Sequence, residues 1–445
     1  MKFSGKRSWR YARHRGLVLV LLLGLVNLAH PFRPGSIAGP LREEIKSPVS
    51  TRTVEGRLAV FDDVWQTISQ RYYDPDYHGA NWDQQLAIFR PQAISASNSH
   101  ELYAVLRRLL TSLNDVHTRV YSPDEKFDWW NPRFVSLGLS VREIEARPTV
   151  VHVEKDSPPY RAGIRPGDVI EEVGQRSALS LINDHITDNP NRVAIRLRAL
   201  AVLFEGAPHT SLELTWRGPN NQLHRGRFEL NWRQRTLGLR VKHVRGRIAV
   251  VELDAFTSSI ATQFNRAMKQ QLSHVNGIVL DLRNNGGGDA EAMAEVASIL
   301  LGPDYSLGSF TDRWGLGFNI QTRLKSMVSP ASLAQTKVPL VVLIGERTSS
   351  AAEILSAALQ RFKRAQLIGA QTCGCVLAIR AQHTLPDGGL LDVSELDFHT
   401  SWGVRLEGNG VTPDETILVR RKDIYSRRDR ALDLALDNLS TQVVQ

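Results

Sequence analysis

Short apolar strands alternate with amphipathic helices through the second half of this chain, and this pattern restricts the fold more than any other feature. The expected elements are strands over 248–253, 277–282 and 339–344, with helices near 260–272 and 289–301. Such alternation is typical of an α/β core in which helices cover a sheet. We therefore predict an α/β domain over residues 235–440.

The first half of the chain predicts two further units, because 445 residues exceed what one hydrophobic core usually organises. Residues 50–125 place apolar side chains at helical spacing, as in Val60, Val64 and Ile68, and predict a helical unit. Residues 134–230 instead show short strands separated by turns. Three parts are therefore expected.

The amino terminus accounts for much of the formal net charge of +9. Six lysines and arginines lie unopposed among the first 15 residues, and an uncharged apolar stretch follows over residues 16–29. This combination predicts export to the periplasm or cell envelope rather than nucleic-acid binding. Residues 1–38 are either a signal peptide cut near the small residues 36–38 or an uncleaved membrane anchor.

Only two cysteines occur, Cys373 and Cys375, and one residue separates them. A disulfide across a single residue would be strained, and two sulfurs without a nearby histidine make a poor zinc site. We expect two small buried side chains, with a redox pair or a thiol nucleophile at Cys375 as alternatives. No metal and no cofactor are predicted.

Residues 345–353 and 371–375 carry a layout that resembles the tail-specific, or C-terminal processing, serine peptidases. In that family a Ser-Ala-Ser-Glu turn holds the nucleophile, and a later Thr-Phe-Gly-Lys segment supplies the base. Ser350 matches the nucleophile, whereas Cys375 occupies the position of the lysine. The resemblance spans residues 55–438 and implies a crotonase-like ββα peptidase core.

Ser350 also has a simpler interpretation, because Ser350-Ala351-Ala352-Glu353 has the pattern of a helix capping box. The neighbouring motifs favour the nucleophile, since residues 385–388 and 407–414 follow in the family's order. A serine at the start of a helix also gains from the positive end of the helix dipole when it carries negative charge.

Without the lysine another base has to activate the serine, and His117 is the candidate. Histidine needs no shift of its pKa to act near neutral pH, whereas the pKa of lysine would have to fall by about three units. Residues 115–118, Asp-Val-His-Thr, resemble the segment that supplies the histidine in the tricorn-like branch of the superfamily. The alternative is a surface histidine at a helix end, with Asp115 as a local partner.

The same branch has a glutamate near the carboxyl end, and Glu407 matches it, beside Gly408 and Gly410. By resemblance this carboxylate holds the histidine ring in its productive tautomer. Asp115 is the second candidate for this role. The alternative for Glu407 is a solvated loop carboxylate without a catalytic task.

The strand at 277–282 runs into a glycine-rich turn, residues 283–288, and then into a helix. Glycines allow close backbone approach, and the start of a helix leaves amide groups unpaired. By resemblance, the amides of Gly287 or Gly288 and of Ala351 form the oxyanion hole. A phosphate-binding loop is the alternative, but the Gly-Lys-Ser that would complete it is missing.

Residues 156–170 include the run Ala-Gly-Ile-Arg-Pro-Gly-Asp-Val-Ile and resemble a PDZ domain, which would cover 134–230. Such domains bind an extended peptide as an added strand, and a glycine-containing loop accepts the terminal carboxylate. The predicted peptide-binding residues are Leu137, Gly138, Leu139 and Ser140. Alternatively, Gly138 only turns the chain and the groove is closed.

These motifs together predict an exported serine endopeptidase that uses its PDZ domain to recognise the carboxyl ends of polypeptides. The alternative is an exported protein that binds peptide termini without cutting them, since the decay of an enzyme would also remove the lysine. Polypeptides are the expected partners, and nucleic acid is not. Membrane anchoring would run through residues 16–29, and the oligomeric state is left open.

Overall fold

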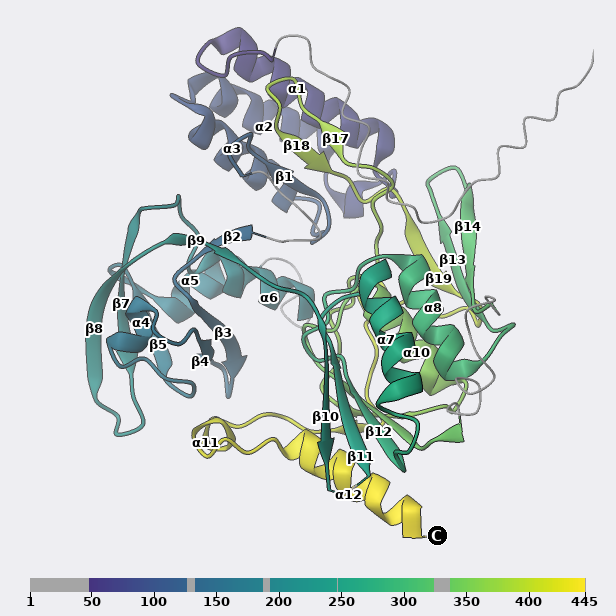
Figure 1. Ribbon diagram of the computed structural model, residues 1–445. Helices are drawn as coiled ribbons and strands as arrows, with labels where there is room; N and C mark the ends of the chain where they lie inside the picture. The colour runs from purple at the N-terminus through teal and green to yellow at the C-terminus, as the bar shows by residue number, and fades with distance from the viewer. Residues whose placement is uncertain (1–47, 126–132, 187–192, 246, 324–336, 445) are drawn as a thin grey trace, which may run out of the picture. The chain divides into compact units, whose positions relative to one another are not determined.

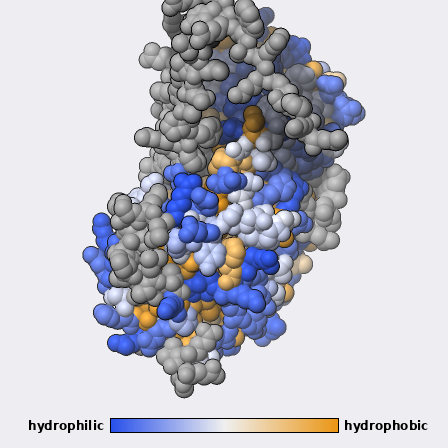
Figure 2. Space-filling view, turned by 90° about the vertical axis from the view of Figure 1, so that its right-hand side faces the viewer, coloured by the Kyte–Doolittle hydropathy of each residue, from blue (hydrophilic) through white to orange (hydrophobic). Residues whose placement is uncertain are grey.

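The computed structural model describes residues 48–125, 133–186, 193–245, 247–323 and 337–444 (Figure 1). The predicted signal peptide or anchor, residues 1–38, lies outside these ranges, as does its apolar stretch at 16–29. Within the described ranges, no helix combines the length and the apolar character that crossing a membrane requires. On the face drawn in Figure 2, hydrophobic residues are scattered among hydrophilic ones.

Three α-helices form the amino-terminal part of the described chain, as the spacing of the apolar residues predicts. They are α1 (Val54–Arg71), α2 (Trp82–Ser95) and α3 (Ser99–Thr111), with a short 3-10 helix η1 (Tyr77–Gly79) after α1. Each α-helix begins after a residue whose side chain accepts an amide of the first turn, namely Thr53, Asn81 and Asn98. The helices bury one shared apolar cluster.

This helical cluster is completed by residues from far along the chain. Strand β1 (Arg119–Tyr121) pairs with β18 (Leu390–Asp392), which also pairs with β17 (His383–Thr384). Leu385 and Leu391 are fully buried in the same cluster as the helices. The helical unit therefore shares its hydrophobic core with a late segment of the chain.

Residues 137–230 enclose a hydrophobic core of their own. The sheet has the order β3-β4-β5-β7-β8, with β6 paired to β5, so β3 forms an outer edge. Its strands are β3 (Leu139–Ile144), β4 (Arg147–Val153), β5 (Val169–Val173), β6 (Arg176–Ser177), β7 (Ser211–Arg217) and β8 (Leu223–Glu229). The helices are α4 (Pro158–Arg161), α5 (Ala178–Asp184) and α6 (Val193–Val202), and β2 (Arg133–Ser136) pairs with β9 (Asn231–Gln234).

The carboxyl-terminal half contains a six-stranded sheet, and the α/β alternation predicted from the sequence is confirmed. The strand order is β10-β11-β12-β15-β16-β20, antiparallel between β10 and β11 and parallel elsewhere. The strands are β10 (Leu239–Val244), β11 (Ile248–Leu253), β12 (Gly277–Asp281), β15 (Leu340–Ile344), β16 (Gln366–Gly369) and β20 (Glu415–Thr416).

Helices cover both faces of this sheet (Figure 1). Side chains of β11 alternate between them: Ala249 and Val251 belong to one apolar cluster, whereas Ile248 and Val250 belong to the other. The first cluster includes residues of α7 (Ser258–Gln270), α8 (Ala290–Leu301) and α10 (Ala351–Arg361), and the second includes residues of α12 (Arg430–Val444), which follows the short α11 (Arg421–Tyr425).

A second, smaller sheet lies in the same half of the chain. It consists of β14 (Gly317–Gln321), β13 (Ser306–Thr311) and β19 (Asp397–Thr400), in that order. The ring of Phe310 packs against the rings of Phe318 and Phe398. No strand was predicted at β13, because serine and glycine interrupt its apolar pattern.

Candidate active site

Ser350 lies in the turn that joins strand β15 to helix α10. Its backbone has φ 54° and ψ −126°, a conformation that residues other than glycine rarely adopt and that persists only where neighbours enforce it. The Ser350 amide donates to the Cys375 carbonyl oxygen at 2.7 Å. The amide of Glu353 donates to the Ser350 carbonyl oxygen at 2.9 Å, and no cap hydrogen bond occupies the hydroxyl. The helix start nevertheless has the predicted capping-box pair, because the Glu353 carboxylate reaches back and accepts the Ser350 amide at 3.2 Å.

Glu353 is fully buried and holds the Ser350 turn against the segment that contains the two cysteines. One carboxylate oxygen accepts the Gly374 amide at 2.7 Å and the Thr372 hydroxyl at 2.5 Å. The other accepts the Cys375 amide at 2.9 Å and the Ser350 amide at 3.2 Å. Burial raises the pKa of Glu353 to about 7, although these hydrogen bonds oppose the rise.

The raised pKa of Glu353 predicts a pH-dependent stability. The folded protein binds more protons than the unfolded chain between the ordinary pKa of 4.5 and the folded pKa of about 7. The contribution of Glu353 to the free energy of unfolding therefore falls as the pH rises through this window, by up to about 3 kcal/mol. In denaturant unfolding measured from pH 4.5 to 8, Glu353→Gln should lose this part of the slope.

The matched control is Glu55→Gln, which makes the same chemical change at an exposed carboxylate. It should keep the pH dependence of the wild type. A Glu353→Gln protein with an unchanged slope would show that Glu353 is not the titrating group.

The glycine-rich turn after β12 packs directly against Ser350. Gly287 has φ +92°, and a Cβ atom added there would lie 2.6 Å from the Cβ of Ser350, so no larger residue fits. The Gly287 amide donates to the Asn285 side-chain oxygen at 2.8 Å. Gly288 forms an isolated β-bridge with Phe256. Its two hydrogen bonds run from the Phe256 amide to the Gly287 carbonyl oxygen and from the Asp289 amide to the Phe256 carbonyl oxygen, so they do not use the Gly288 amide. Among the predicted oxyanion donors, the Gly287 amide is thus already engaged.

The loop that carries His117 is fixed by Asp115, a buried residue after helix α3. One oxygen of Asp115 accepts the His117 amide at 2.7 Å. The other accepts the Thr118 amide at 3.1 Å and the Ser394 hydroxyl at 2.5 Å. Asp115 thereby ties the first folded unit to the segment between β18 and β19.

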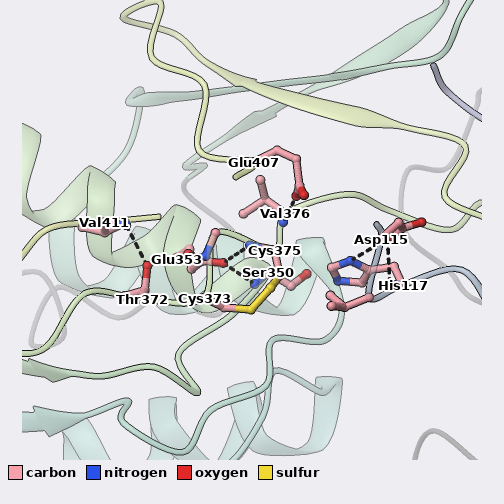
Figure 3. Close-up of a disulfide and its surroundings, with 12 residues drawn as sticks. Asp115, His117, Ser350, Glu353, Thr372, Cys373, Cys375, Val376, Glu407 and Val411 are labelled. Atoms are coloured by element: carbon pink, nitrogen blue, oxygen red, sulfur yellow. Dashed lines mark hydrogen bonds and ion pairs between the residues drawn. A yellow bond between two sulfur atoms is a disulfide. The ribbon is translucent and has the colours of Figure 1, made fainter. Parts of the chain in front are cut away.

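The imidazole of His117 faces Ser350 (Figure 3). The side chain of Ser350 points toward the ring, and Nδ1 of His117 lies 3.8 Å from the near oxygen of Asp115. Within the described residues Nδ1 is buried and makes no hydrogen bond. Burial lowers the pKa of His117 below its ordinary 6.5, against the opposing charge of Asp115, so the ring is neutral near pH 7. Val116, the neighbour of His117, packs against the apolar cluster that contains Cys375, and the Cys375 carbonyl oxygen accepts the Ser350 amide, so the two predicted residues belong to adjoining segments.

Glu407 is buried near the same loop but is directed differently. Its carboxylate accepts the Val376 amide at 2.7 Å, and Figure 3 shows it pointing to that amide. The neighbouring Gly408 amide donates to the Gly374 carbonyl oxygen at 2.9 Å. Glu407 therefore bonds to the segment that also contacts Ser350, whereas the carboxylate 3.8 Å from the His117 ring is that of Asp115.

Cys373 and Cys375 form a disulfide, which corrects the expectation of two separate buried thiols. Both residues are buried, as predicted. The bridge is possible because Gly374 between them has φ +69°, which lets the chain turn and bring the two Cα atoms to 5.2 Å. The signal for this bridge in the sequence is the glycine between the two cysteines, because glycine readily adopts a positive φ. The capping-box pattern of the sequence does not reveal that Glu353 also accepts the amides of Gly374 and Cys375.

The predicted peptide-binding residues lie at the start of the edge strand β3. Gly138 has φ +83°, and its backbone packs against Glu154 and Arg233, whose side chains form an ion pair. Leu137 is buried, and β3 pairs with β4 on one side. The Val141 carbonyl oxygen of β3 accepts a long contact of 3.4 Å from Arg347.

Two segments of this chain match models of known protein families. Residues 247–417 match the model of peptidase family S41, and residues 55–111 match the Tricorn protease C1 domain. Carboxyl-terminal-processing peptidase 2, chloroplastic, from Arabidopsis thaliana is 27% identical over 83% of this chain and 70% of its own length. The carboxyl-terminal-processing protease of Picosynechococcus is 26% identical over 79% of this chain and 81% of its own.

Among solved structures, mature CPAF shares this fold with a TM-score of 0.65 and 14% identity, over 88% of this chain and 98% of its own. The relatives named for carboxyl-terminal processing and the two family segments agree with the motifs around Ser350. The chain is a serine peptidase that contains a peptidase family S41 domain over residues 247–417 and a segment of the Tricorn protease C1 type over residues 55–111.

Proposed function

We propose that this peptidase is an exported endopeptidase that cleaves polypeptides through an acyl-enzyme on Ser350, with His117 as the general base. The single observation that carries the proposal is the side chain of Ser350 directed at a neutral, buried imidazole. Residues 235–440 would form a peptidase core of the crotonase-like ββα type. The strained backbone of Ser350 supports a nucleophile, because such strain concentrates at functional residues.

The proposed reaction has two halves. Ser350 Oγ attacks the carbonyl carbon of the substrate while His117 takes the hydroxyl proton, and His117 then gives this proton to the leaving amine. Water, deprotonated by the same imidazole, next attacks the acyl-enzyme and releases the carboxylate product together with free Ser350. A neutral ring is the form that can accept a proton, so the lowered pKa of His117 suits this role.

Negative charge on the tetrahedral intermediate would be stabilised by backbone amides. Ala351 begins helix α10 directly after the nucleophile, and Gly287 and Gly288 pack beside it. Because Asn285 engages the Gly287 amide, Ala351 and Gly288 are the favoured pair in this conformation. A single donor of this kind is worth about 3 to 4 kcal/mol in acyl transfer.

Glu407 is proposed to complete the catalytic set, as the tricorn-like resemblance implies. Its burial and its bond to the Val376 amide support a structured role over that of a solvated loop residue. Asp115 is the alternative orienting carboxylate, and its distance of 3.8 Å from Nδ1 of His117 favours it in the present conformation. Hydrogen bonds between catalytic groups are often long before substrate binds and shorten afterwards. A shorter contact of His117 with either carboxylate is therefore compatible with the mechanism.

Residues 134–230 are proposed to form a PDZ domain that receives the carboxyl end of the substrate. The position of β3 at the edge of its sheet supports the addition of a peptide strand, and the loop at Leu137, Gly138, Leu139 and Ser140 would hold the terminal carboxylate. Export to the periplasm or cell envelope is proposed from residues 1–38, which would be removed or kept as an anchor.

The proposal is tested by treating the purified protein with a fluorophosphonate probe and, in parallel, with unfolded casein. We expect covalent labelling on Ser350, located by peptide mass spectrometry, and internal cleavage of casein. A protein that neither labels nor cleaves, yet binds peptides with a free carboxyl end, would instead be a peptide-binding protein. Cleavage stopped only by a thiol alkylator would move the nucleophile to a cysteine.

A further inference from the structure

The Cys373–Cys375 disulfide lies inside the proposed active site (Figure 3). The Cys375 carbonyl oxygen accepts the Ser350 amide at 2.7 Å, and the Cys373 amide donates to the Thr348 carbonyl oxygen at 3.0 Å. The residues on both ends of the bridge are therefore bonded to the turn that presents the nucleophile.

The same short segment also bonds to two buried glutamates, Glu353 and Glu407. The amides of Gly374 and Cys375 donate to Glu353, which in turn accepts the Ser350 amide. The next amide, that of Val376, donates to Glu407. A change in the shape of this segment would move partners of Ser350 and Glu407 together.

The segment has little space in which to change shape while the site stays intact. Cys375 is 1% exposed and Cys373 is 7% exposed. Val116, the neighbour of His117, packs against the two sulfur-bearing residues. On the other side, a Cβ atom added to Gly374 would lie 3.0 to 3.1 Å from backbone atoms of residues 408–410.

We propose that the Cys373–Cys375 disulfide is a positioning element for Ser350 and that its reduction by a dithiol switches the peptidase off. The inference rests on the proposed role of Ser350 as the nucleophile. It gives a function to the cysteine that occupies the lysine position of the C-terminal processing family: the bridge shapes the backbone that holds the serine, and supplies no base.

The reduction balances as an ordinary thiol–disulfide exchange. A thiolate of the dithiol attacks Cys373, whose residue is the more exposed of the two, and Cys375 leaves as a thiolate. The second thiol of the reductant then attacks the mixed disulfide and releases Cys373. The reductant becomes a disulfide, two electrons pass to the protein, and each cysteine takes up one proton.

Reduction misplaces the nucleophile for a steric reason. Two unbonded sulfur atoms need van der Waals separation, so the buried segment must expand against residues that are already in contact with it. The Cys375 carbonyl oxygen then moves relative to the Ser350 amide. A displacement of about 1 Å at a catalytic group can cost about a hundredfold in rate.

The test compares casein cleavage and fluorophosphonate labelling of the same protein when oxidised, when reduced with dithiothreitol, and after reoxidation. Alkylation of the reduced protein, read by mass, establishes that both thiols are free. We expect the reduced protein to lose kcat by tenfold or more at nearly unchanged KM, and reoxidation to restore it. The double variant Cys373→Ser/Cys375→Ser, whose two unbonded side-chain oxygens also need van der Waals separation, should have low activity that does not respond to dithiothreitol, with an unchanged circular dichroism spectrum.

Two outcomes would overturn the inference. One is full activity with both thiols shown to be free. The other is a bridge that dithiothreitol does not open in the folded protein, because a switch has to be accessible. Failure of the proposed function is distinct from both, since it would appear as absent labelling of Ser350 in the oxidised protein.

Discussion

Replacing Ser350 with alanine should abolish casein cleavage and fluorophosphonate labelling. In serine peptidases that act through an acyl-enzyme, loss of the nucleophile lowers kcat by about 10⁶-fold. The change removes one oxygen atom and leaves the partners of the Ser350 amide in place, namely Cys375 and Glu353. Thermal unfolding should therefore change little, and the loss can be assigned to chemistry.

Ser349→Ala is the matched control, because it makes the same change one position earlier in the same turn. The Ser349 amide bonds to the Asn285 carbonyl oxygen at 3.1 Å, and this contact uses only backbone atoms that the variant keeps. Activity should stay within a small factor of the wild type. Labelling that persists in Ser350→Ala and disappears in Ser349→Ala would assign the nucleophile to the neighbouring serine.

Replacing His117 with alanine should lower kcat/KM by at least the 10² to 10⁴-fold that general acid–base catalysis contributes. The loss should be accompanied by a changed pH profile. Because burial lowers the pKa of His117, the wild type should keep its activity down to below pH 6.5, and the acid limb that marks protonation of this ring should be absent from the variant.

His185→Ala is the control for the histidine, since it removes an exposed imidazole that bonds to the Leu181 carbonyl oxygen of its own helix. Its activity and pH profile should match those of the wild type. Full activity in His117→Ala would contradict the proposed base, and the remaining carboxylates of the site, Glu353 and Glu407, would then have to be tested in its place.

Much of the fold follows from local pattern. The strand expected at 248–253 is β11, residue for residue, and the strand expected at 339–344 differs from β15 by one residue. Both strands contribute to the apolar clusters on the two faces of the sheet, so their sequences are mostly apolar, with Glu252 of β11 as the exception. The helices α7 and α8 were likewise anticipated, because one apolar stripe faces the sheet.

The candidate site was only partly predictable, because its contacts join distant segments. Sequence motifs point to Ser350 and His117 as candidates. The spacing of these motifs does not determine that Asp115 accepts a hydrogen bond from the Ser394 hydroxyl. The one-residue spacing of the cysteines argues against a disulfide, whereas the positive φ of Gly374 makes the bond feasible. Such pairings depend on tertiary geometry that local preferences do not contain.

The pairing of β1 with β18 has a consequence for synthesis on the ribosome. The loop with His117 is made early, whereas Ser350, the proposed nucleophile, and strand β18, which pairs with the strand after His117, are translated much later. The two proposed catalytic residues therefore cannot meet until most of the polypeptide has emerged.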